Sequence, residues 1–355
     1  TNPNRVRKVA FQTSRLKHLF PTLFRLRNRK DNQYNLHYFR MEIDNIYNMD
    51  CLEGMKQIPD GTIDAVICDL PYGTMKGIVN APGWENCSCE WDSIIPTDKL
   101  FAEYDRVLRT NGTAVLFSQE PYTSHLRTYP KKSNLRFCYP LIWRKGSAGN
   151  ALMSYKAPVS VFEDMNVFIK PYDSNGTNLL REYFAAVLKF IGKPKRDIMQ
   201  AIGQGADHVF RVDSTQWALC TADTYGDIIR QYGIDKMQGF RTYEDLQSED
   251  IAFKEKYKRV FNLPEMANSM SNVLEFSKDT DGFHPTQKPV ALIRRLVLTY
   301  TNEGDTVLDN CMGSGTTAIA CIKERRHFIG FELSKEYFDK AVRRIKAEQA
   351  QLTLF

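Results

Sequence analysis

The sequence predicts an α/β fold with an inserted helical module, and three observations support this prediction. From Met41 onward, short apolar segments typical of strands alternate with segments whose apolar residues recur every three or four positions. Two of the apolar segments end in an acid, Asp69 or Asp309, which a turn containing proline or glycine follows, as in ligand-binding loops of α/β proteins. Between residues 175 and 262 the alternation stops and helix-like segments follow one another, which indicates an insertion.

Each predicted strand is a short apolar run bounded by polar or turn-forming residues. Strands are expected at residues 45–48, 64–70, 113–118, 139–144, 166–170, 306–309 and 328–332. The predicted helices are longer and have apolar residues at helical spacing. They are expected at residues 52–58, 99–108, 290–300, 315–323 and 335–348.

The insertion is expected to contain helices at residues 179–191, 195–202, 223–232 and 244–261. Glycine and proline residues that break helices lie between them. These patterns divide the chain into three parts: a basic N-terminal extension at 1–40, an α/β domain formed by 41–174 and 263–355, and a helical insert at 175–262.

Composition excludes several classes of protein. With 355 residues, of which 43% are apolar, the chain has the make-up of an ordinary globular protein. No apolar run reaches the roughly 18–20 residues of a membrane span, and no secretory signal is evident. The eight cysteines are scattered, and the close pair Cys87 and Cys89 lacks a second pair at zinc spacing. We therefore expect a cytoplasmic protein with reduced thiols, no membrane contact and no metal.

The positive charge is concentrated at the beginning of the chain. Residues 1–40 hold ten Lys or Arg and one acid, whereas the remainder holds 38 basic and 41 acidic residues. A segment of this kind can contact nucleic-acid phosphates. The alternatives, which we favour, are a solvated basic tail or a non-native leader before a start at Met41.

The segment at residues 306–332 has the pattern of a site for a nucleotide-like cofactor. A predicted strand ends at Asp309, a glycine-rich turn follows, and a helix begins near Gly315. The turn glycines let the backbone pass close to a ligand, and free amides at the helix N-terminus favour a carboxylate. Glu332, 19 positions after Gly313, ends the next strand and can accept hydrogen bonds from two ribose hydroxyls. An ordinary turn before a helix is the alternative. The candidate cofactor residues of this segment are Asp309, Met312, Gly313, Gly315, Thr316 and Glu332.

Two further segments offer polar groups to the same cofactor. Asp50 follows a predicted strand and can accept a hydrogen bond from an adenine amine, or it can cap the helix predicted at 52–58. The run at 284–289 precedes another helix and presents Thr286 and Lys288, which can bind a carboxylate. A plain helix start is the alternative for this run.

The segment that ends the strand at 64–70 has the composition of a clamp for an exocyclic amine on a nucleobase. Such an amine is a poor nucleophile because its lone pair is delocalised into the ring. Asp69 and the main-chain carbonyl of Leu70 or Pro71 can accept hydrogen bonds from the amine and draw its nitrogen toward a pyramidal geometry. Pro71 fixes the local backbone, and Tyr72 offers a flat face to a base extruded from a duplex. A simple turn after a strand is the alternative.

Asp69-Leu70-Pro71-Tyr72, combined with the glycine loop Asp309…Gly313-Ser314-Gly315-Thr316, resembles the amino-group DNA methyltransferases. The clamp of that family has the pattern Asp/Asn/Ser-Pro-Pro-Tyr. The order of clamp, helical insert and glycine loop is similar to the β class, a circular permutation of the Rossmann-like methyltransferase fold. The resemblance covers most of residues 41–345. It implies S-adenosylmethionine as cofactor and Asp69, Pro71 and Tyr72 as catalytic residues.

Two residues depart from the family pattern. Leu70 stands where proline is usual, which leaves the main-chain carbonyl in place. Cys311 stands where many members have a phenylalanine that packs on the cofactor, and we expect weaker cofactor affinity from this change. The Asp form of the clamp is most often found in adenine-N6 enzymes and the Ser form in cytosine-N4 enzymes, so Asp69 favours adenine.

In this family the target-recognition region lies between clamp and glycine loop, which here is residues 143–283. The part at 193–216 resembles a helix-turn-helix reader, and its Arg, Lys and Gln side chains are those that reach purine edges. The alternative is an ordinary helical subdomain with a solvated basic face. A second basic and aromatic stretch, at 143–146 and 155–156, either lines the DNA groove or ends a strand. The candidate DNA contacts are Tyr72, Lys145, Lys195, Arg196, His208 and Arg211.

The leading interpretation is a site-specific DNA methyltransferase that transfers a methyl group from S-adenosylmethionine to the N6 amine of adenine. Cytosine-N4 methylation is the alternative within the family, and RNA or protein-glutamine methylation is a weaker one. A catalytically inactive DNA-binding protein on the same fold is the non-enzyme alternative. The resemblance implies double-stranded DNA as partner and a prokaryotic or phage-like cytoplasm. It leaves open a homodimer and a partner restriction endonuclease.

Overall fold

A computed structural model of the chain describes residues 41–73, 92–129, 133–146, 155, 158–279 and 287–352. The predictions for the extension at 1–40, for Cys87 and Cys89, and for Thr286 lie outside these residues. The described residues all belong to one compact unit, Arg40–Phe355. Among their helices, none has both the length and the apolar composition that crossing a bilayer requires.

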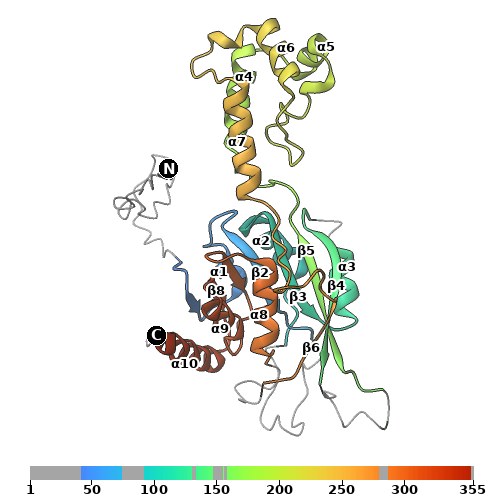
Figure 1. The fold of residues 1–355 in the computed structure, drawn as a ribbon, viewed down its shortest axis with the longest axis vertical. Helices are drawn as coiled ribbons and strands as arrows, with labels where there is room; N and C mark the ends of the chain where they lie inside the picture. The colour runs from blue at the N-terminus through green and yellow to red at the C-terminus, as the bar shows by residue number, and fades with distance from the viewer. Residues whose placement is uncertain are drawn as a thin grey trace, which may run out of the picture. The chain divides into compact units, whose positions relative to one another are not determined.

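Within the described residues, eight strands form one mixed sheet in the order β1-β8-β7-β2-β3-β5-β4-β6 (Figure 1). Neighbouring strands are parallel, except that β5 runs antiparallel to β3 and β4. This sheet confirms the predicted α/β class. The strands are β1 (Asn45–Tyr47), β2 (Ile63–Asp69), β3 (Leu108–Ser118), β4 (Arg136–Lys145), β5 (Phe162–Ile169), β6 (Val273–Phe276), β7 (Thr306–Asp309) and β8 (His327–Phe331).

Helices cover both faces of the sheet. One apolar cluster joins the sheet to α8, α9 and α10, and a second joins it to α1, α2 and α3. On β2, Ile67 belongs to the first cluster, whereas Val66 and Cys68 belong to the second. Burial on both faces explains why β2 is a continuous apolar run and not an alternating one. The helices are α1 (Cys51–Met55), α2 (Thr97–Val107), α3 (Tyr122–Thr128), α8 (Val290–Tyr300), α9 (Thr316–Lys323) and α10 (Lys335–Leu352).

The strand order brings distant parts of the chain to one edge of the sheet. β7 lies beside β2, with Leu308 opposite Val66, although more than two hundred residues separate the two strands. Because β1, β8, β7, β2 and β3 are parallel, their carboxyl ends share this edge. β5 runs the other way, so it contributes its amino end there, with Asp164 opposite Ser118. Ligand sites of open α/β sheets lie at such an edge.

Residues 175–262 form a helical module with a core of its own, and Figure 1 shows its helices grouped together. The third apolar cluster lies wholly within this segment and centres on aromatic residues such as Phe184 and Tyr225. Gly192 and Gly233 end α4 and α6 in the left-handed conformation that favours glycine. The helices of the module are α4 (Leu180–Ile191), α5 (Lys195–Ile202), α6 (Ala222–Tyr232) and α7 (Tyr243–Lys256).

Two short elements were not predicted from the sequence. Helix α3 consists mainly of Tyr, Thr, Ser and His, which are weak helix formers, and it exists because Tyr122 and Leu126 pack into the second apolar cluster. Strand β6 has only four residues and pairs along β4 at the end of the sheet order. Both elements depend on tertiary contacts that local patterns do not reveal.

Helix α7 ends earlier than the sequence predicted. The expected helix ran to residue 261, but the observed helix ends at Lys256. Asn111 donates a hydrogen bond to the Tyr257 carbonyl at 2.9 Å, and Arg109 donates one to the Lys258 carbonyl at 3.3 Å. In a longer helix these two carbonyls would accept hydrogen bonds from amides further along the helix. Because side chains of the β3 region bind them instead, the helix ends at this point.

We expect opposite effects from replacing glycine by alanine in two helices. At Gly54 in α1, a Cβ atom would lie 2.2 Å from the Phe331 ring, so Gly54→Ala should reduce the free energy of unfolding by about 1–3 kcal/mol. At Gly226 in α6, the nearest atom is the flexible end of Arg230 at 3.3 Å, and Gly226→Ala should raise stability by up to about 1 kcal/mol. Urea unfolding of both variants tests this contrast. Equal effects would show that the packing of Phe331 on α1 does not constrain position 54.

Candidate active site

The two segments that the sequence singled out meet at the same edge of the sheet. Asp69 ends β2 and Asp309 ends β7, and these strands are hydrogen-bonded neighbours. The clamp segment and the glycine loop therefore begin side by side. The pairing of β2 with β7 thus brings together two segments that lie some 240 positions apart in the chain.

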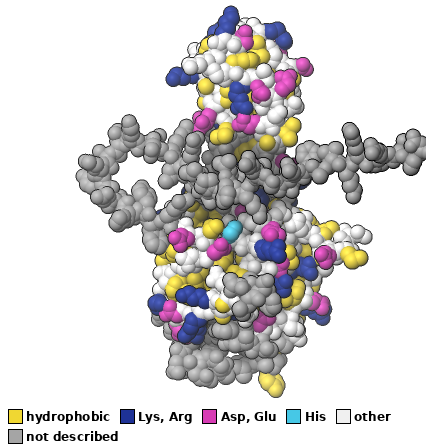
Figure 2. All heavy atoms as spheres, turned by 60° about the vertical axis from the view of Figure 1, so that its left-hand side comes forward, with side chains coloured by type: hydrophobic (Ala, Val, Ile, Leu, Met, Phe, Trp, Pro, Cys, Tyr) yellow, Lys and Arg dark blue, Asp and Glu magenta, His cyan; other side chains and the backbone are white. Residues whose placement is uncertain are grey.

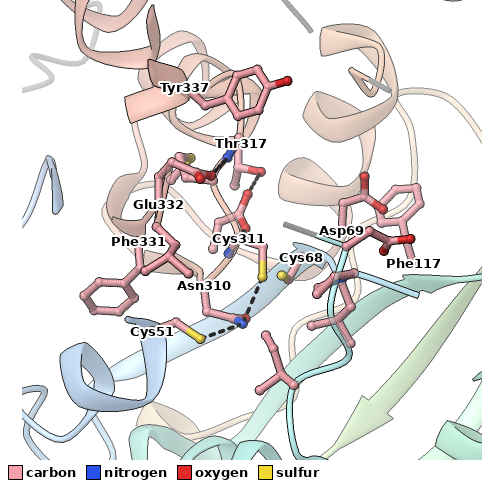
Figure 3. A pocket seen from close by; sticks show the side chains of 18 of the residues that line it. Cys51, Cys68, Asp69, Phe117, Asn310, Cys311, Thr317, Phe331, Glu332 and Tyr337 are labelled. Carbon is pink, nitrogen blue, oxygen red and sulfur yellow. Dashed lines mark hydrogen bonds between the residues drawn. The ribbon is translucent and has the colours of Figure 1, made fainter. Parts of the chain in front are cut away.

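A cavity of about 710 Å³ lies where these segments meet. Figure 3 shows Glu332 and Tyr337 on one side of it and Asp69 and Phe117 on the other. Of the predicted cofactor residues that the structure describes, all except Gly315 line this cavity, as does the whole clamp. The predicted residues in the lining are Asp50, Asp69, Pro71, Tyr72, Lys288, Asp309, Met312, Gly313, Thr316 and Glu332.

The glycine loop is bound to the strand that follows it. Gly313 has a φ of 53°, and its amide donates a hydrogen bond of 2.8 Å to Oε2 of Glu332. The other carboxylate oxygen of Glu332 accepts a hydrogen bond of 2.8 Å from the Ser334 amide. Burial raises the pKa of Glu332. The loop and the acid thus form one preorganised unit at the cavity wall.

Two predicted residues have structural roles that the sequence analysis did not assign to them. Gly315, with a φ of 82°, begins α9, and a Cβ atom there would lie 3.3 Å from Cβ of Ala341 in α10. It therefore shapes the loop and does not line the cavity. Asp309 accepts hydrogen bonds from the Thr317 hydroxyl at 2.6 Å and the Cys311 amide at 3.1 Å, which close the loop on itself.

Asp50 caps α1, which was the structural alternative considered for it. Its Oδ1 accepts hydrogen bonds from the amides of Leu52 at 2.9 Å and Glu53 at 3.2 Å. It also lines the cavity, so a contact with a cofactor stays a prediction.

The clamp carboxylate has a partner on each oxygen. The Tyr72 hydroxyl donates a hydrogen bond to Oδ1 of Asp69, and the Lys288 ammonium donates one to Oδ2. From its sequence context, Lys288 was predicted to bind a cofactor carboxylate. In the structure its ammonium is bound to the clamp instead, and also lies 3.1 Å from Glu163.

Glu163 extends the clamp into a chain of four alternating charges, in which Asp69 is partly exposed and Lys288, Glu163 and Lys145 are buried. It stands at the amino end of β5, and its second oxygen is 2.6 Å from the ammonium of Lys145 at the carboxyl end of β4. The Lys145 side chain is only 7% exposed. The prediction that Lys145 contacts DNA therefore does not fit the structure. The alternative considered for this stretch, that it ends a strand, does.

The environment of these charges shifts their pKa values. Burial raises the pKa of Asp69, against the opposing effect of Lys288. Burial also disfavours charge on Lys288, but Asp69 and Glu163 outweigh it and hold the pKa of Lys288 above its usual range. In the same way Lys288 and Lys145 outweigh burial at Glu163 and hold its pKa low. The site thus keeps charged groups in a dry place by pairing them.

Three cysteines gather at the bottom of the cavity, as Figure 3 shows for Cys51, Cys68 and Cys311. The Asn310 amide contacts Cys311 at 3.5 Å and Cys51 at 3.8 Å. Contact with Cys311 and burial raise the pKa of Cys51, and burial raises the pKa of Cys68 to about 12. The pKa of Cys311 also lies well above its usual range. All three side chains are therefore neutral thiols at pH 7.

The predicted DNA contacts of the helical module lie on and after α5. Lys195 is 2.7 Å from Asp207, which also pairs with Arg211. His208 is hydrogen-bonded to the Gln216 carbonyl at 3.1 Å. Arg196 is 92% exposed and is the most solvent-accessible of the group. The second predicted stretch includes residue 156, which lies outside the described residues.

Several residues of the cavity were not predicted from the sequence, above all Glu163. Its predicted strand began at residue 166, so the acid at 163 was not placed at the edge of the sheet. A predicted strand over the full length of β5, Phe162–Ile169, would have placed Glu163 at the edge of the sheet. Other unpredicted lining residues are Phe117, Gln119, Leu333, Ser334 and Tyr337.

Comparison with known proteins finds similar sequences among DNA methyltransferases. The N6/N4 methyltransferase family model, described as DNA methylase, matches residues 63–343. The DNA adenine methyltransferase YhdJ of Escherichia coli K12 is 25% identical over 313 residues, which cover 86% of this chain and 84% of that protein. The type II methyltransferase M.HindIII of Haemophilus influenzae is 23% identical over 346 residues, covering 86% of this chain and 96% of that protein.

Solved structures also match the chain. The crystal structure of the M1.HpyAVI–SAM complex has a TM-score of 0.49 and 21% sequence identity, and the match covers 84% of this chain and 98% of that one.

The buried Asp309 predicts a pH dependence of stability. Burial raises its pKa to about 6 in the folded protein, above the usual 3.8, so the folded state binds the proton more tightly than the unfolded state. Stability from this group is therefore lost as pH rises from about 4 to about 6, by roughly 3 kcal/mol. In Asp309→Asn the amide can still accept from Cys311 and donate to Thr317, and the variant should gain stability relative to the native protein as pH rises. Urea unfolding between pH 4 and 7 measures this difference, with exposed Asp339→Asn on α10 as control. A difference that does not change with pH would contradict the prediction.

Proposed function

The chain belongs to the N6/N4 DNA methylase family, and from this premise we propose that it methylates the N6 amine of adenine at a specific site in double-stranded DNA, with S-adenosylmethionine as methyl donor. The observation that carries the proposal is the shared cavity of the glycine loop and the Asp69 clamp. A cofactor pocket and an amine clamp on one cavity place a donor and an acceptor within reach of each other.

The cavity residues fit this cofactor in size and chemistry. A cavity of about 710 Å³ is in the range of small-molecule sites. Glu332 would accept from the ribose hydroxyls, and the turn at Gly313 would let the ligand approach the backbone. Met312 and Phe331 would supply apolar walls. When bound, S-adenosylmethionine supplies an electrophilic methyl carbon on its sulfonium.

The clamp would prepare the amine for attack. Asp69 would accept one amine hydrogen and the carbonyl of Leu70 or Pro71 the other, which moves the nitrogen lone pair out of the ring. Tyr72 would stack on the extruded base and offset part of the cost of unstacking it. Direct displacement at a methyl carbon requires in-line geometry more than a strong base. Asp69, Pro71 and Tyr72 are therefore the proposed catalytic residues.

Adenine is preferred to cytosine because the clamp begins with Asp69, the form that the family resemblance associates with adenine-N6 enzymes. YhdJ, which aligns over most of both chains, is named an adenine methyltransferase, which supports the same choice. Cytosine-N4 methylation is the alternative outcome of the test below.

We assign target recognition to the helical module at 175–262. Its independent core supports a separate reading element, and Arg196 offers an exposed positive side chain at the start of α5. Figure 2 shows basic and acidic side chains together on the visible face of the molecule. A homodimer, a partner restriction endonuclease and a cytoplasmic location stay predictions that rest on the family resemblance.

Sequencing of genomic DNA with modified-base detection, from cells that express the protein, tests the function directly. We expect N6-methyladenine within one short recurring sequence, absent from cells without the protein. N4-methylcytosine would select the alternative, and unmodified DNA would overturn the proposal.

Asp69→Ala should abolish the methylation of DNA while binding of S-adenosylmethionine remains. Loss of the amine acceptor should reduce single-turnover methyl transfer by about 100-fold or more. The dissociation constant for S-adenosylmethionine, measured by calorimetry, should stay within about threefold, because the cofactor residues lie on other strands. Asp339→Ala on exposed α10 is the control for loss of an acid. Normal transfer by Asp69→Ala would end the clamp model.

Arg196→Ala should weaken DNA binding about 3- to 10-fold and lower the slope of affinity against salt by about one, if its guanidinium contacts a phosphate. The matched control is Arg325→Ala, which removes a similarly exposed arginine before β8, at the opposite edge of the sheet from the cavity. Fluorescence anisotropy at several salt concentrations measures both. Equal weakening by the two variants would show that the module makes no defined contact through Arg196.

A further inference from the structure

Both carboxylate oxygens of Asp69 have donors before any base is present. Tyr72 donates to Oδ1 and Lys288 to Oδ2. In the proposed function a base amine must also donate to this carboxylate. The two partners differ in how firmly they are held, and this difference decides which oxygen the amine can reach.

Lys288 is held on three sides. Its side chain is 6% exposed, and its ammonium lies 3.1 Å from Glu163 and 5.2 Å from the centre of the Phe117 ring. Glu163 is itself fixed by Lys145, whose ammonium lies 2.6 Å away and also contacts the Trp143 ring at 5.4 Å. Removal of Lys288 from this position would leave the buried Glu163 and the partly buried Asp69 without their shared cation.

Tyr72 is held by weaker polar contacts: its ring packs against the apolar clusters on both faces of the sheet, but among the described residues its hydroxyl bonds Asp69 alone. It is half-buried and lies in the loop after β2, directly before Gly73, which has a φ of 74°. Its proposed stacking on an extruded base requires the ring to leave its present hydrogen bond with Asp69. The amine of the base then takes the place of the hydroxyl, so the carboxylate keeps the same number of donors.

We propose that Lys288, held in place by Glu163, is a positioning residue for the clamp: it retains Oδ2 of Asp69 and leaves Oδ1, which the Tyr72 hydroxyl covers, for the target amine. This inference rests on the proposed function. It gives Lys288 a different role from the cofactor contact that the sequence suggested, and it gives Glu163 a role in the same site.

The charge of Lys288 also affects the pKa of Asp69 and hence the pH range in which the clamp carboxylate is ionised. The titratable groups around Asp69 come from several elements: Tyr72 on the same loop, Lys288 before α8, Glu163 on β5, Asp309 on β7 and Cys68 on β2. Among them, Lys288 supplies the positive charge that lowers the pKa of Asp69, whereas Glu163 raises it. Loss of Lys288 should therefore raise the pKa of Asp69, and loss of the Glu163 charge should lower it.

Lys288→Met is the principal test. Single-turnover methyl transfer at saturating S-adenosylmethionine should fall about 10- to 100-fold, because Asp69 is no longer fixed. The acid limb of the pH–rate profile should move to higher pH, and the dissociation constant for the cofactor should stay within about threefold. Lys288→Arg, which keeps the charge, should restore the native position of the acid limb.

Glu163→Gln is the second variant and leaves Lys288 paired with Asp69. It should reduce transfer less than Lys288→Met and should move the acid limb to lower pH. Lys170→Met is the control, since Lys170 is also a buried lysine but binds main-chain carbonyls of Asp105 and Leu108 away from the cavity. It should leave the acid limb unchanged, even where it lowers stability.

Two results would overturn the inference. One is a rise of tenfold or more in the cofactor dissociation constant of Lys288→Met with normal transfer at saturation, which would assign Lys288 to the cofactor. The other is an unchanged acid limb in both Lys288→Met and Glu163→Gln. Failure of the proposed function is separate, because the native protein would then transfer no methyl group to DNA at any pH.

Discussion

The pairing of β2 with β7 is the constraint on which the site depends. The two strands are far apart in the chain, yet they lie side by side and parallel, so the residues that follow them emerge at the same edge of the sheet. Burial of Ile67, Val307 and their neighbours between two helical layers fixes this register. A slip of one residue would turn each side chain of β2 to the opposite face. The sheet core thus sets the distance between clamp and glycine loop.

The antiparallel strand β5 adds a second constraint. Its amino end lies at the edge where the parallel strands have their carboxyl ends, and this places Glu163 at the cavity. There the acid pairs with Lys145 from β4 and with Lys288, which precedes α8. The resulting chain runs from Asp69 through Lys288 and Glu163 to Lys145 and is electrically balanced. Burying charges is costly unless each has a partner, and here each has one. The network therefore gives the clamp a fixed orientation that a flexible loop alone would not provide.

The sequence predicted those parts of the site in which a short local pattern explains why a residue type stands at its position. Asp69 after an apolar strand, and Glu332 at the end of the strand after a glycine loop, are patterns of this kind, and the structure brings them to one cavity. The residues that sequence analysis misplaced depend on partners across the sheet. Lys145 was expected at a DNA surface because its neighbours in sequence are basic and aromatic, but Glu163 on the adjacent strand holds it inside. Gly315 was expected at the ligand, but its open side faces α10. The order of strands in the sheet determines where these side chains point, and a local sequence pattern does not reveal that order.

The protonation of the thiols at the bottom of the cavity affects whether a bound methyl donor can methylate the enzyme itself. The proposed methyl donor is an alkylating agent, and sulfur attacks such a carbon only as the thiolate. Burial raises the pKa of Cys51, Cys68 and Cys311 and favours the protonated thiol at each of them. A methyl donor bound in this cavity would therefore meet protonated sulfur atoms, which are poor nucleophiles. Burial of these thiols would thus protect the enzyme from methylation by its own cofactor.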